Sequence, residues 1–316
     1  MRRTARPVAL FVAVVLAGGC TRQVAAPDVP PAPSASPTRS PSPTPSPSPT
    51  PAPSPTPKPS PKPRVVPSKA AARPTYSPRG QKHLVRNKIY SAGAVPAVAC
   101  VLPDIALRSQ KAVQQYSRAV LDCLQRAWKP VVVRAGVRFG PSAVYAVNQG
   151  SRTACGTFGK EDGGYYCPED AGIYLDWDEH VEDAQFSHVG AQVYLQFTMA
   201  HEFGHHVQQL VGISTYYDDR WGELTGPAHL EPMRRHELQA SCFGSAFLGA
   251  NQASLNLYDD RFEWYRWAAH SGDDDEAGRV RDHGSRASNT SWADAAFAAK
   301  SPAACNTWVA PASWVS

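Results

Sequence analysis

Apolar side chains recur every three or four positions along several stretches of the chain, which is the spacing of one face of a helix. Between Leu107 and Trp128 this pattern predicts a helix, and we expect it to end at Pro130, because proline interrupts helical hydrogen bonding. The same spacing predicts further helices over residues 191–211, 232–248, 259–271 and 287–299.

Three short apolar runs predict β-strands: Val131–Val133, Ala143–Val147 and Gly172–Asp176. A small sheet that leads into a series of helices is typical of the α+β class. The segment 80–316 is long enough to form a sizeable core, so we expect one folded domain there.

Residues 1–20 have the pattern of an export signal. A basic start precedes an apolar run from Val8 to Leu16, and small residues then lead to Cys20. The run is too short for an ordinary membrane span. We therefore predict a bacterial lipoprotein-type signal peptide, with lipid on Cys20 anchoring the protein to the cell membrane on its extracytoplasmic side. Ala17 stands where a lipobox most often has leucine, so simple secretion and an uncleaved anchor remain alternatives.

Residues 21–79 consist mostly of Pro, Ser, Thr and Ala. Such a segment has almost nothing apolar to bury, and its prolines favour the extended polyproline II conformation. We predict a disordered linker, in which roughly forty residues at about 3.1 Å each reach on the order of 120 Å. That length suits a domain held away from a membrane.

The formal net charge of +5 hides a division along the chain. Residues 1–88 carry 14 Lys and Arg and one acid, Asp28, which leaves 18 basic and 26 acidic residues in the remainder, a balance of −8. Nucleic acid binding needs a basic face on the domain, so we do not expect nucleic acid as a partner. The basic linker is instead suited to contact with an anionic cell wall or lipid surface.

Six cysteines remain once Cys20 is set aside for lipid, and an even number in an exported chain predicts disulfides. Six cysteines allow 15 pairings. Proximity along the chain favours Cys100 with Cys123, Cys155 with Cys167, and Cys242 with Cys305. A cysteine zinc cluster is the competing interpretation, and the absence of any C-x-x-C pair disfavours it.

The run His201-Glu202-Phe203-Gly204-His205 contains the pattern H-E-x-x-H. On a helix, residues four apart lie on one face, so His201 and His205 can direct two imidazole nitrogens at one zinc ion while Glu202 reaches a bound water. Apolar residues at helical spacing on both sides of the motif would bury such a helix. The alternative is that both histidines are core residues bonded to the backbone.

A catalytic zinc site normally takes three protein ligands and a water. A third histidine in the pattern H-E-x-x-H-x-x-G-x-x-H is excluded, because Gln208 and Val211 occupy the required positions. A glutamate on a later helix is the other common solution, and Glu237, 32 residues beyond His205, fits it. Glu237 paired with Arg234 on a solvated face and His236 as the ligand are the alternatives.

The chain combines several short motifs: Cys167-Pro168, Ile173-Tyr174-Leu175-Asp176, the run 201–208, Glu237-Leu238-Gln239-Ala240 and His283-Gly284-Ser285. As a set they resemble the putative neutral zinc metallopeptidase family of bacteria, over roughly residues 86–300. The resemblance implies a zincin-like fold, a glutamate as third zinc ligand and peptidase activity.

Two positions depart from the family pattern. Ser241 stands where the family usually has aspartate, and the residues after His283 lack the Gln-Arg that commonly follows. Ser241 lies four residues after Glu237, so both should face the helix that carries His201 and His205. The family aspartate there is expected to accept a hydrogen bond from a zinc histidine, and Ser241 would accept it without the negative charge.

The sequence thus predicts a membrane-anchored zinc peptidase that acts on a peptide or protein. Zn²⁺ would be held by His201, His205 and Glu237, and Glu202 would take a proton from the zinc-bound water. His283 could donate to the developing oxyanion, or simply bond to Asp282. We expect the strand from Ile173 to lie at a sheet edge, where an extended substrate could pair with it.

Two other functions remain open. The domain could be a non-catalytic, zinc-stabilised module that binds at the cell surface, or a zinc amidase that acts on peptidoglycan stem peptides.

His206 is turned about 100° from His205 on a helix and should therefore be a surface group or a neighbour of the ligands.

Overall fold

The computed structural model describes residues 75–159 and 163–316. The predicted signal peptide, Cys20 and nearly all of the predicted linker lie outside these residues. Within the described part of the chain, no helix is both long enough and apolar enough to span a membrane.

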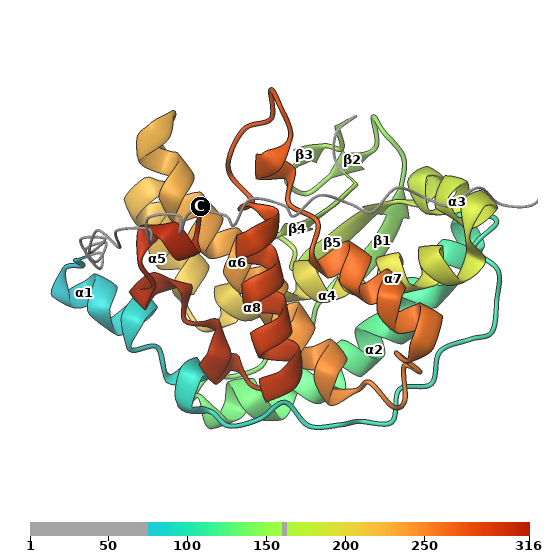
Figure 1. Ribbon diagram of the computed structural model, residues 1–316, viewed down its shortest axis with the longest axis horizontal. Coiled ribbons are helices and arrows are strands. Elements are labelled where there is room, and N and C mark those ends of the chain that lie inside the picture. Colours follow the sequence, from blue (N-terminus) through green and yellow to red (C-terminus); the bar gives the residue numbers. More distant parts are fainter. Residues whose placement is uncertain (1–74, 160–162) are drawn as a thin grey trace, which may run out of the picture. The chain divides into compact units, whose positions relative to one another are not determined.

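The described chain begins with short helical turns and then alternates a long helix, a small sheet and a series of helices (Figure 1). The strands are β1 (Ala143–Val147), β2 (Arg152–Thr153), β3 (Gly156–Thr157), β4 (Gly164–Cys167) and β5 (Gly172–Asp176). The main helices are α2 (Gln110–Arg134), α3 (Trp177–Phe186), α4 (His188–Leu210), α5 (Ile213–Trp221), α6 (Pro227–Ala250), α7 (Asp259–Ala269) and α8 (Arg286–Ala299). The predicted α+β class is confirmed.

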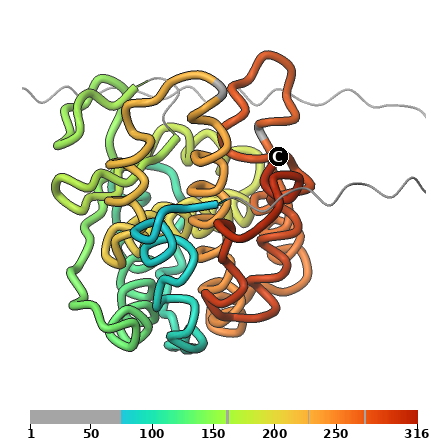
Figure 2. The backbone as a smooth tube through the Cα atoms, turned by 90° about the vertical axis from the view of Figure 1, so that its left-hand side faces the viewer, coloured from blue at the N-terminus to red at the C-terminus, as the bar shows by residue number. Residues whose placement is uncertain are grey.

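Short turns of helix lie at both ends of the described chain and between α7 and α8. They are α1 (Pro78–Gly80), a π-helical turn (Gln81–Val85), and 3₁₀ turns at Lys88–Ser91, Asp273–Asp275, Pro302–Cys305, Thr307–Val309 and Ala312–Trp314. The first described residues and the C-terminal turns lie side by side in Figure 2. The side-chain amide of Asn306 joins them by donating to the Val85 carbonyl, 2.9 Å away.

The helix α2 continues through Pro130, so the prediction of a helix end there and of a strand at Val131–Val133 was wrong. The apolar stripe explains the difference, because Trp128, Val131 and Val132 are all fully buried and continue the helical spacing. Burial of such side chains contributes about 1.5–3 kcal/mol each. Together they offset the roughly 3 kcal/mol cost of proline inside a helix.

The main sheet has the order β1-β5-β4, in which β5 runs parallel to β1 and antiparallel to β4. All five residues of β5 are buried, and the strand is paired on both sides. The prediction that this strand lies at a sheet edge was therefore wrong. Because β5 is covered on both faces, its sequence is an apolar run. Such a run does not show whether a strand lies at the edge or in the middle of a sheet. The edge strands on either side of it are β1 and β4.

The largest core cluster lies between α2, α4 and α6 and extends to the inner face of the sheet. The helices α4 and α6 approach each other very closely. A Cβ atom built on Gly204 of α4 would lie 2.5 Å from the Ala240 carbonyl oxygen of α6, so only glycine fits there. This crossing sets the distance between residues carried by the two helices.

Two of the three predicted disulfides are present: Cys155 with Cys167, and Cys242 with Cys305. The predicted bond between Cys100 and Cys123 is absent, and both residues are buried thiols. Each sulfur has another polar neighbour. The Arg126 guanidinium donates to Cys123 Sγ at 3.3 Å, and Cys100 Sγ lies 3.9 Å from Asn251 Oδ1.

Candidate metal centre

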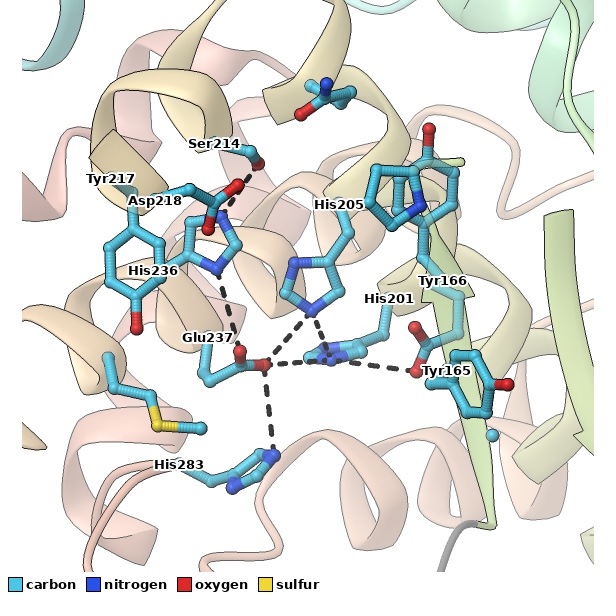
Figure 3. A pocket seen from close by; sticks show the side chains of 15 residues that line it. Tyr165, Tyr166, His201, His205, Ser214, Tyr217, Asp218, His236, Glu237 and His283 are labelled. Atoms are coloured by element: carbon cyan, nitrogen blue, oxygen red, sulfur yellow. Dashed lines mark hydrogen bonds and ion pairs between the residues drawn. The ribbon is translucent and has the colours of Figure 1, made fainter. Parts of the chain in front are cut away.

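The helix α4 begins at a Ser187 cap, whose hydroxyl accepts from the Gly190 N–H, and buries most of its length. His201 and His205 lie one turn apart on the side of this helix that faces a cavity (Figure 3). Their Nε2 atoms are 3.2 Å apart. The i, i+4 spacing therefore brings two potential ligand atoms together, as the sequence pattern predicts.

The crossing helix α6 contributes the third group. Glu237 Oε2 lies 3.1 Å from His205 Nε2 and 3.4 Å from His201 Nε2. The three side chains are between 12% and 15% exposed, so they are shielded from bulk water but open to the cavity. Among the described residues, these three form the group of His, Cys, Asp and Glu side chains that could hold a metal ion.

The separations between these atoms match those required by zinc. Ligand atoms about 2.0–2.1 Å from a tetrahedral zinc lie about 3.3 Å from one another, and the observed separations are 3.1, 3.2 and 3.4 Å. Two imidazole nitrogens and one carboxylate oxygen are also a donor set that zinc enzymes use. His201, His205 and Glu237 would hold the ion and leave one position open to the cavity.

Two further candidates lie beside the three ligand atoms. Glu202 is 6% exposed and lines the cavity, with Oε1 3.9 Å from His201 Nε2. His283 enters from the loop before α8, with Nε2 3.8 Å from Glu237 Oε2. Its Nδ1 lies 2.7 Å from Asp282 Oδ1, and its backbone N–H donates to Asp274 Oδ1. His283 thus contacts Asp282 and also reaches the candidate ligands. Its bond to Asp282 and a role as donor to the oxyanion are therefore compatible.

A cleft runs past these groups on both sides. One cavity, of about 320 Å³, extends between β4 and α5 and is lined by Tyr166, Tyr217 and Met233. A second cavity, of about 810 Å³, extends towards α3 and α7 and is lined by Glu179 and Tyr194. The two cavities share Gly164, His201, Glu202 and His283 in their linings. The candidate metal centre therefore lies where the two cavities meet.

The sequence model of the putative neutral zinc metallopeptidase family matches residues 89–308 of the chain. The chain belongs to this family. The resemblance on which the sequence analysis relied is thereby confirmed.

The similar proteins carry no assigned function in their names. An uncharacterized protein of Escherichia coli K12, YpfJ, is 28% identical over 206 residues, which cover 61% of this chain and 71% of that protein. An uncharacterized protein of Mycobacterium tuberculosis H37Rv, Rv2575, is 27% identical over 192 residues, or 50% of this chain and 59% of that protein. No solved structure matches the chain.

In this member of the zinc metallopeptidase family, uncharged side chains orient both histidines. Ser241 Oγ lies 2.9 Å from His201 Nδ1, and Gln208 Oε1 lies 2.9 Å from His205 Nδ1. The Gln208 amide is fixed in turn by donating to the His236 carbonyl at 2.8 Å. A ring that donates from Nδ1 presents the lone pair of Nε2 to the cavity, which is the form that binds metal.

Gln208 was missed as a neighbour of the ligands, although its place three residues after His205 was a usable signal. His206 is 1% exposed, so its interpretation as a surface group was wrong. Its ring bonds to the Gly140 carbonyl and to the Tyr166 hydroxyl, and thereby connects α4 to β4. His236 is not one of the three ligand groups, since its Nε2 lies 2.9 Å from Ser214 Oγ.

The acidic and basic groups of the site each favour the charged form of the other. Burial alone would raise the pKa of the Glu237 carboxyl, but the His205 charge and hydrogen bonds from neighbouring histidines hold this pKa well below its usual range. Burial alone would lower the pKa of His205, whereas Glu237 and Glu202 raise it to about 9. A divalent metal ion would take the place of the proton that these charges attract to His205.

Proposed function

We propose that this protein is a zinc-dependent peptidase that hydrolyses peptide bonds in an extended substrate bound along the cleft. The observation that carries the proposal is the position of the Glu202 carboxylate beside the ligand atoms of His201, His205 and Glu237, within one cavity. A site that only stabilised the fold would need neither a neighbouring carboxylate nor an open side.

When bound, zinc would lower the pKa of a coordinated water and polarise the substrate carbonyl. The chain's own residues would move the proton. Glu202 would accept it from the water and deliver it to the leaving amine, and its burial beside the ligands keeps the carboxylate close to the reacting atoms. Asp282 would stabilise a doubly protonated His283, whose Nε2–H could then donate to the carbonyl oxygen as negative charge develops.

The edge strand β4 is suited to hold the substrate backbone. The Asp176 N–H donates to the Gly163 carbonyl, so Gly163 and Tyr165 direct their backbone groups towards β5 in the antiparallel ladder. The backbone groups of Gly164 and Tyr166 then point to the opposite side, where both residues line the cleft. An extended peptide could pair there as an added strand, in place of the pairing expected at β5.

The test compares two variants with the unaltered protein in zinc analysis and in cleavage of a mixed peptide library. Glu202→Gln should keep one zinc per chain and lose cleavage, because an amide cannot accept the proton from water. His201→Ala should lose both zinc and cleavage. Near-normal cleavage by Glu202→Gln would refute Glu202 as the base.

The same assay separates the alternative functions. A full zinc content without cleavage of any library peptide would favour the non-catalytic surface module. Cleavage confined to peptidoglycan stem peptides would favour the amidase. Peptides N-methylated at a single backbone position test the β4 pairing, since only certain positions should lose cleavage if backbone hydrogen bonds hold the substrate.

We further propose that the protein is exported and anchored by lipid on Cys20, with the Pro-rich linker holding the domain away from the membrane. The sequence of residues 1–79 supports this proposal. Cys20→Ala should move the protein from the membrane fraction to the medium or leave an unprocessed precursor. Unchanged, detergent-dependent membrane association with normal processing would refute the anchor.

A further inference from the structure

His236 directly precedes the ligand Glu237 on α6, and its ring points towards the Glu237 carboxylate (Figure 3). Its Nδ1 lies 3.6 Å from Glu237 Oε1, whereas the other oxygen, Oε2, faces His201 and His205. The two oxygens of this carboxylate therefore have different neighbours. One faces the candidate metal position, and the other faces His236.

Three neighbours fix the His236 ring in this orientation. On one side it stacks on the ligand His205, with ring centroids 4.9 Å apart. On another it stacks nearly parallel to Tyr217, with centroids 4.6 Å apart and an interplanar angle of 14°. Its Nε2 lies 2.9 Å from Ser214 Oγ. Because Ser214 and Tyr217 both belong to α5, this helix holds the ring against the ligands.

The hydrogen-bonding partners determine where the ring proton lies. An ionised carboxylate only accepts hydrogen bonds, so the ring nitrogen that faces Glu237 must carry the proton if the contact is to be favourable. The remaining nitrogen, Nε2, is then an acceptor, and the Ser214 hydroxyl can donate to it. In this arrangement each nitrogen of a neutral ring that is only 9% exposed faces a group of the opposite hydrogen-bonding kind.

We propose that His236 is a positioning residue for the metal centre. Its Nδ1–H attracts Glu237 Oε1 and so keeps Oε2 directed at the metal, while its stacked ring fixes the plane of His205. The distance of 3.6 Å exceeds that of a full hydrogen bond, and a small rotation of the carboxylate would close it. The inference rests on the proposed zinc site, and it names a residue that acts through Glu237 and His205.

The test replaces His236 with three side chains that separate donation from stacking. Asn places an N–H donor near the position of Nδ1, Gln places its amide near the position of Nε2, and Phe keeps a stacked ring without a donor. The readouts are zinc affinity, by competition with a chelator at fixed pH, and the visible absorption of the Co²⁺-substituted protein. A matched control is His270→Phe at the end of α7, a residue outside the lining of both cavities whose Nε2 lies 2.8 Å from Asp294 Oδ1.

We expect His236→Phe and His236→Gln to weaken zinc binding by about 10- to 100-fold, the usual loss when a partner of a ligand is removed. Both should change the Co²⁺ spectrum, because the carboxylate is then free to turn. His236→Asn should lose less affinity than either, because it keeps the donor and gives up only the stacked ring, whereas the His270→Phe control should bind zinc within about threefold of the unaltered protein with an unchanged spectrum.

Several results would overturn the proposal. Unchanged affinity and spectrum in His236→Phe would show that no donor is needed at this position. Losses in His236→Asn and His236→Gln with none in His236→Phe would assign the effect to packing of the ring. Failure of the unaltered protein to bind zinc or Co²⁺ would remove the site itself. By contrast, zinc binding that follows the expected order in a protein without peptidase activity would support the inference and refute only the proposed function.

Discussion

At the scale of single residues, an uncharged side chain contacts each of the three candidate ligands. Ser241 lies against His201, Gln208 lies against His205, and His236 faces Glu237. Metal-binding histidines often donate instead to a carboxylate, whose charge makes the ring a stronger ligand. The uncharged partners here should orient the ligands but leave them less basic than a carboxylate partner would. Zinc would then be held more weakly, and it would withdraw more charge from a bound water.

Ser241→Asp tests this argument. A carboxylate at this position would accept the His201 Nδ1–H with a full negative charge, so we expect zinc affinity to rise roughly tenfold. Competition with a chelator at fixed pH measures the change. Ser241→Asn is the matched control, because it has nearly the same shape as aspartate but no charge, and it should not tighten binding. Equal effects of Asp and Asn would mean that the charge plays no part.

The cluster of three candidate ligands could be predicted, because H-E-x-x-H fixes its geometry on one helix and the family resemblance supplies Glu237. Gln208 and His236 could not be assigned in the same way. Gln208 faces His205 through its own helix but is fixed by the His236 carbonyl of α6. His236 depends on Ser214 of α5. These contacts follow from how three helices cross, which no spacing within one helix specifies.

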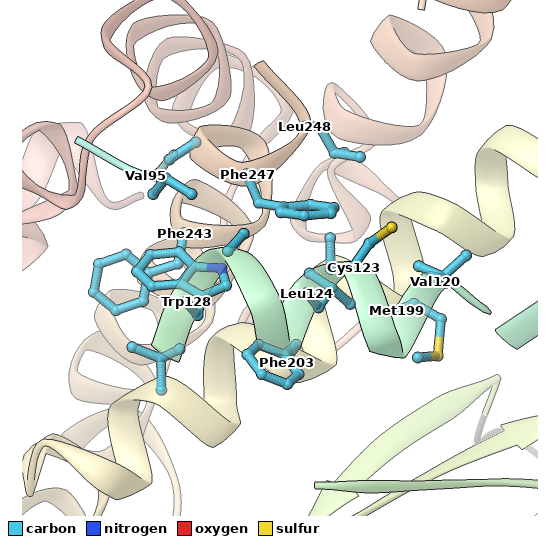
Figure 4. Close-up of a cluster of buried hydrophobic side chains, with 14 of the residues drawn as sticks. Val95, Val120, Cys123, Leu124, Trp128, Met199, Phe203, Phe243, Phe247 and Leu248 are labelled. Atoms are coloured by element: carbon cyan, nitrogen blue, oxygen red, sulfur yellow. The ribbon is translucent and has the colours of Figure 1, made fainter. Parts of the chain in front are cut away.

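At the scale of elements, the close crossing of α4 and α6 holds the two histidines and Glu237 together. The core around it is well filled, and Figure 4 shows Trp128 and Leu124 of α2 packed with Phe203 of α4 and with Phe243 and Phe247 of α6. The backbones meet where side chains are smallest.

Gly204→Ala should therefore damage both stability and metal binding. The added Cβ would lie 2.5 Å from the Ala240 carbonyl oxygen and 2.8 Å from its Cα, and these backbone atoms can move only if the helices separate. We expect a loss of about 1–3 kcal/mol in the free energy of unfolding, as for other overpacked cores. Zinc affinity should fall as well, because Glu237 would move away from the histidines.

Urea unfolding and chelator competition measure the two effects of Gly204→Ala. Gly140→Ala provides the control, since a Cβ there would meet Leu210 Cδ2 at an ordinary distance of 3.6 Å. If Gly204→Ala kept full stability but lost zinc, the crossing would not be the cause. Equal losses in both variants would also contradict the argument.

A second prediction at this scale concerns His180 in α3. This residue is 1% exposed, and neither ring nitrogen has a hydrogen-bond partner among the described residues. Burial lowers its pKa to about 4. The unfolded chain binds the proton below about pH 6.5, whereas the folded protein does not until about pH 4. Stability should therefore fall as the pH drops through this interval, by up to about 3 kcal/mol.

His180→Phe should remove this contribution. The free energy of unfolding of the variant should decline less between pH 7 and pH 4 than that of the unaltered protein, because phenylalanine has no proton to bind. Denaturant unfolding at several pH values gives both curves, and other titrating groups cancel in the difference. If the free energies of unfolding of the two proteins change in parallel over the whole pH range, burial does not lower the proton affinity of His180.

Two elements illustrate why the sequence predicted helices better than strands. The apolar spacing of α4, α6, α7 and α8 is long enough to identify each helix. The three valines after Pro130 form too short a run, and the core around Trp128 decides that they continue α2. The position of β5 inside the sheet depends on its pairing with β4, which precedes it closely, and also with β1, from which three strands separate it in the sequence.

At the scale of the whole molecule, the two disulfides fasten different parts of the chain. Cys155–Cys167 joins the turn between β2 and β3 to the end of β4, across a separation of 12. Cys242–Cys305 joins α6 to the C-terminal turns across a separation of 63. Chain proximity predicted both bonds, but the third bond that it predicted, between Cys100 and Cys123, is absent, and both residues are buried thiols.

The last prediction compares the two disulfides through paired replacements by alanine. A longer closed loop restricts the unfolded chain more, so removing Cys242–Cys305 should cost about 1.5 kcal/mol more than removing Cys155–Cys167. Urea unfolding under non-reducing conditions measures both losses. Thiol labelling of the denatured, unreduced protein should find Cys100 and Cys123 reactive in the unaltered chain and in both variants. A larger loss from the short loop would mean that local packing around the hairpin outweighs chain entropy, and that α6 keeps its position without a covalent tie to the C-terminal turns.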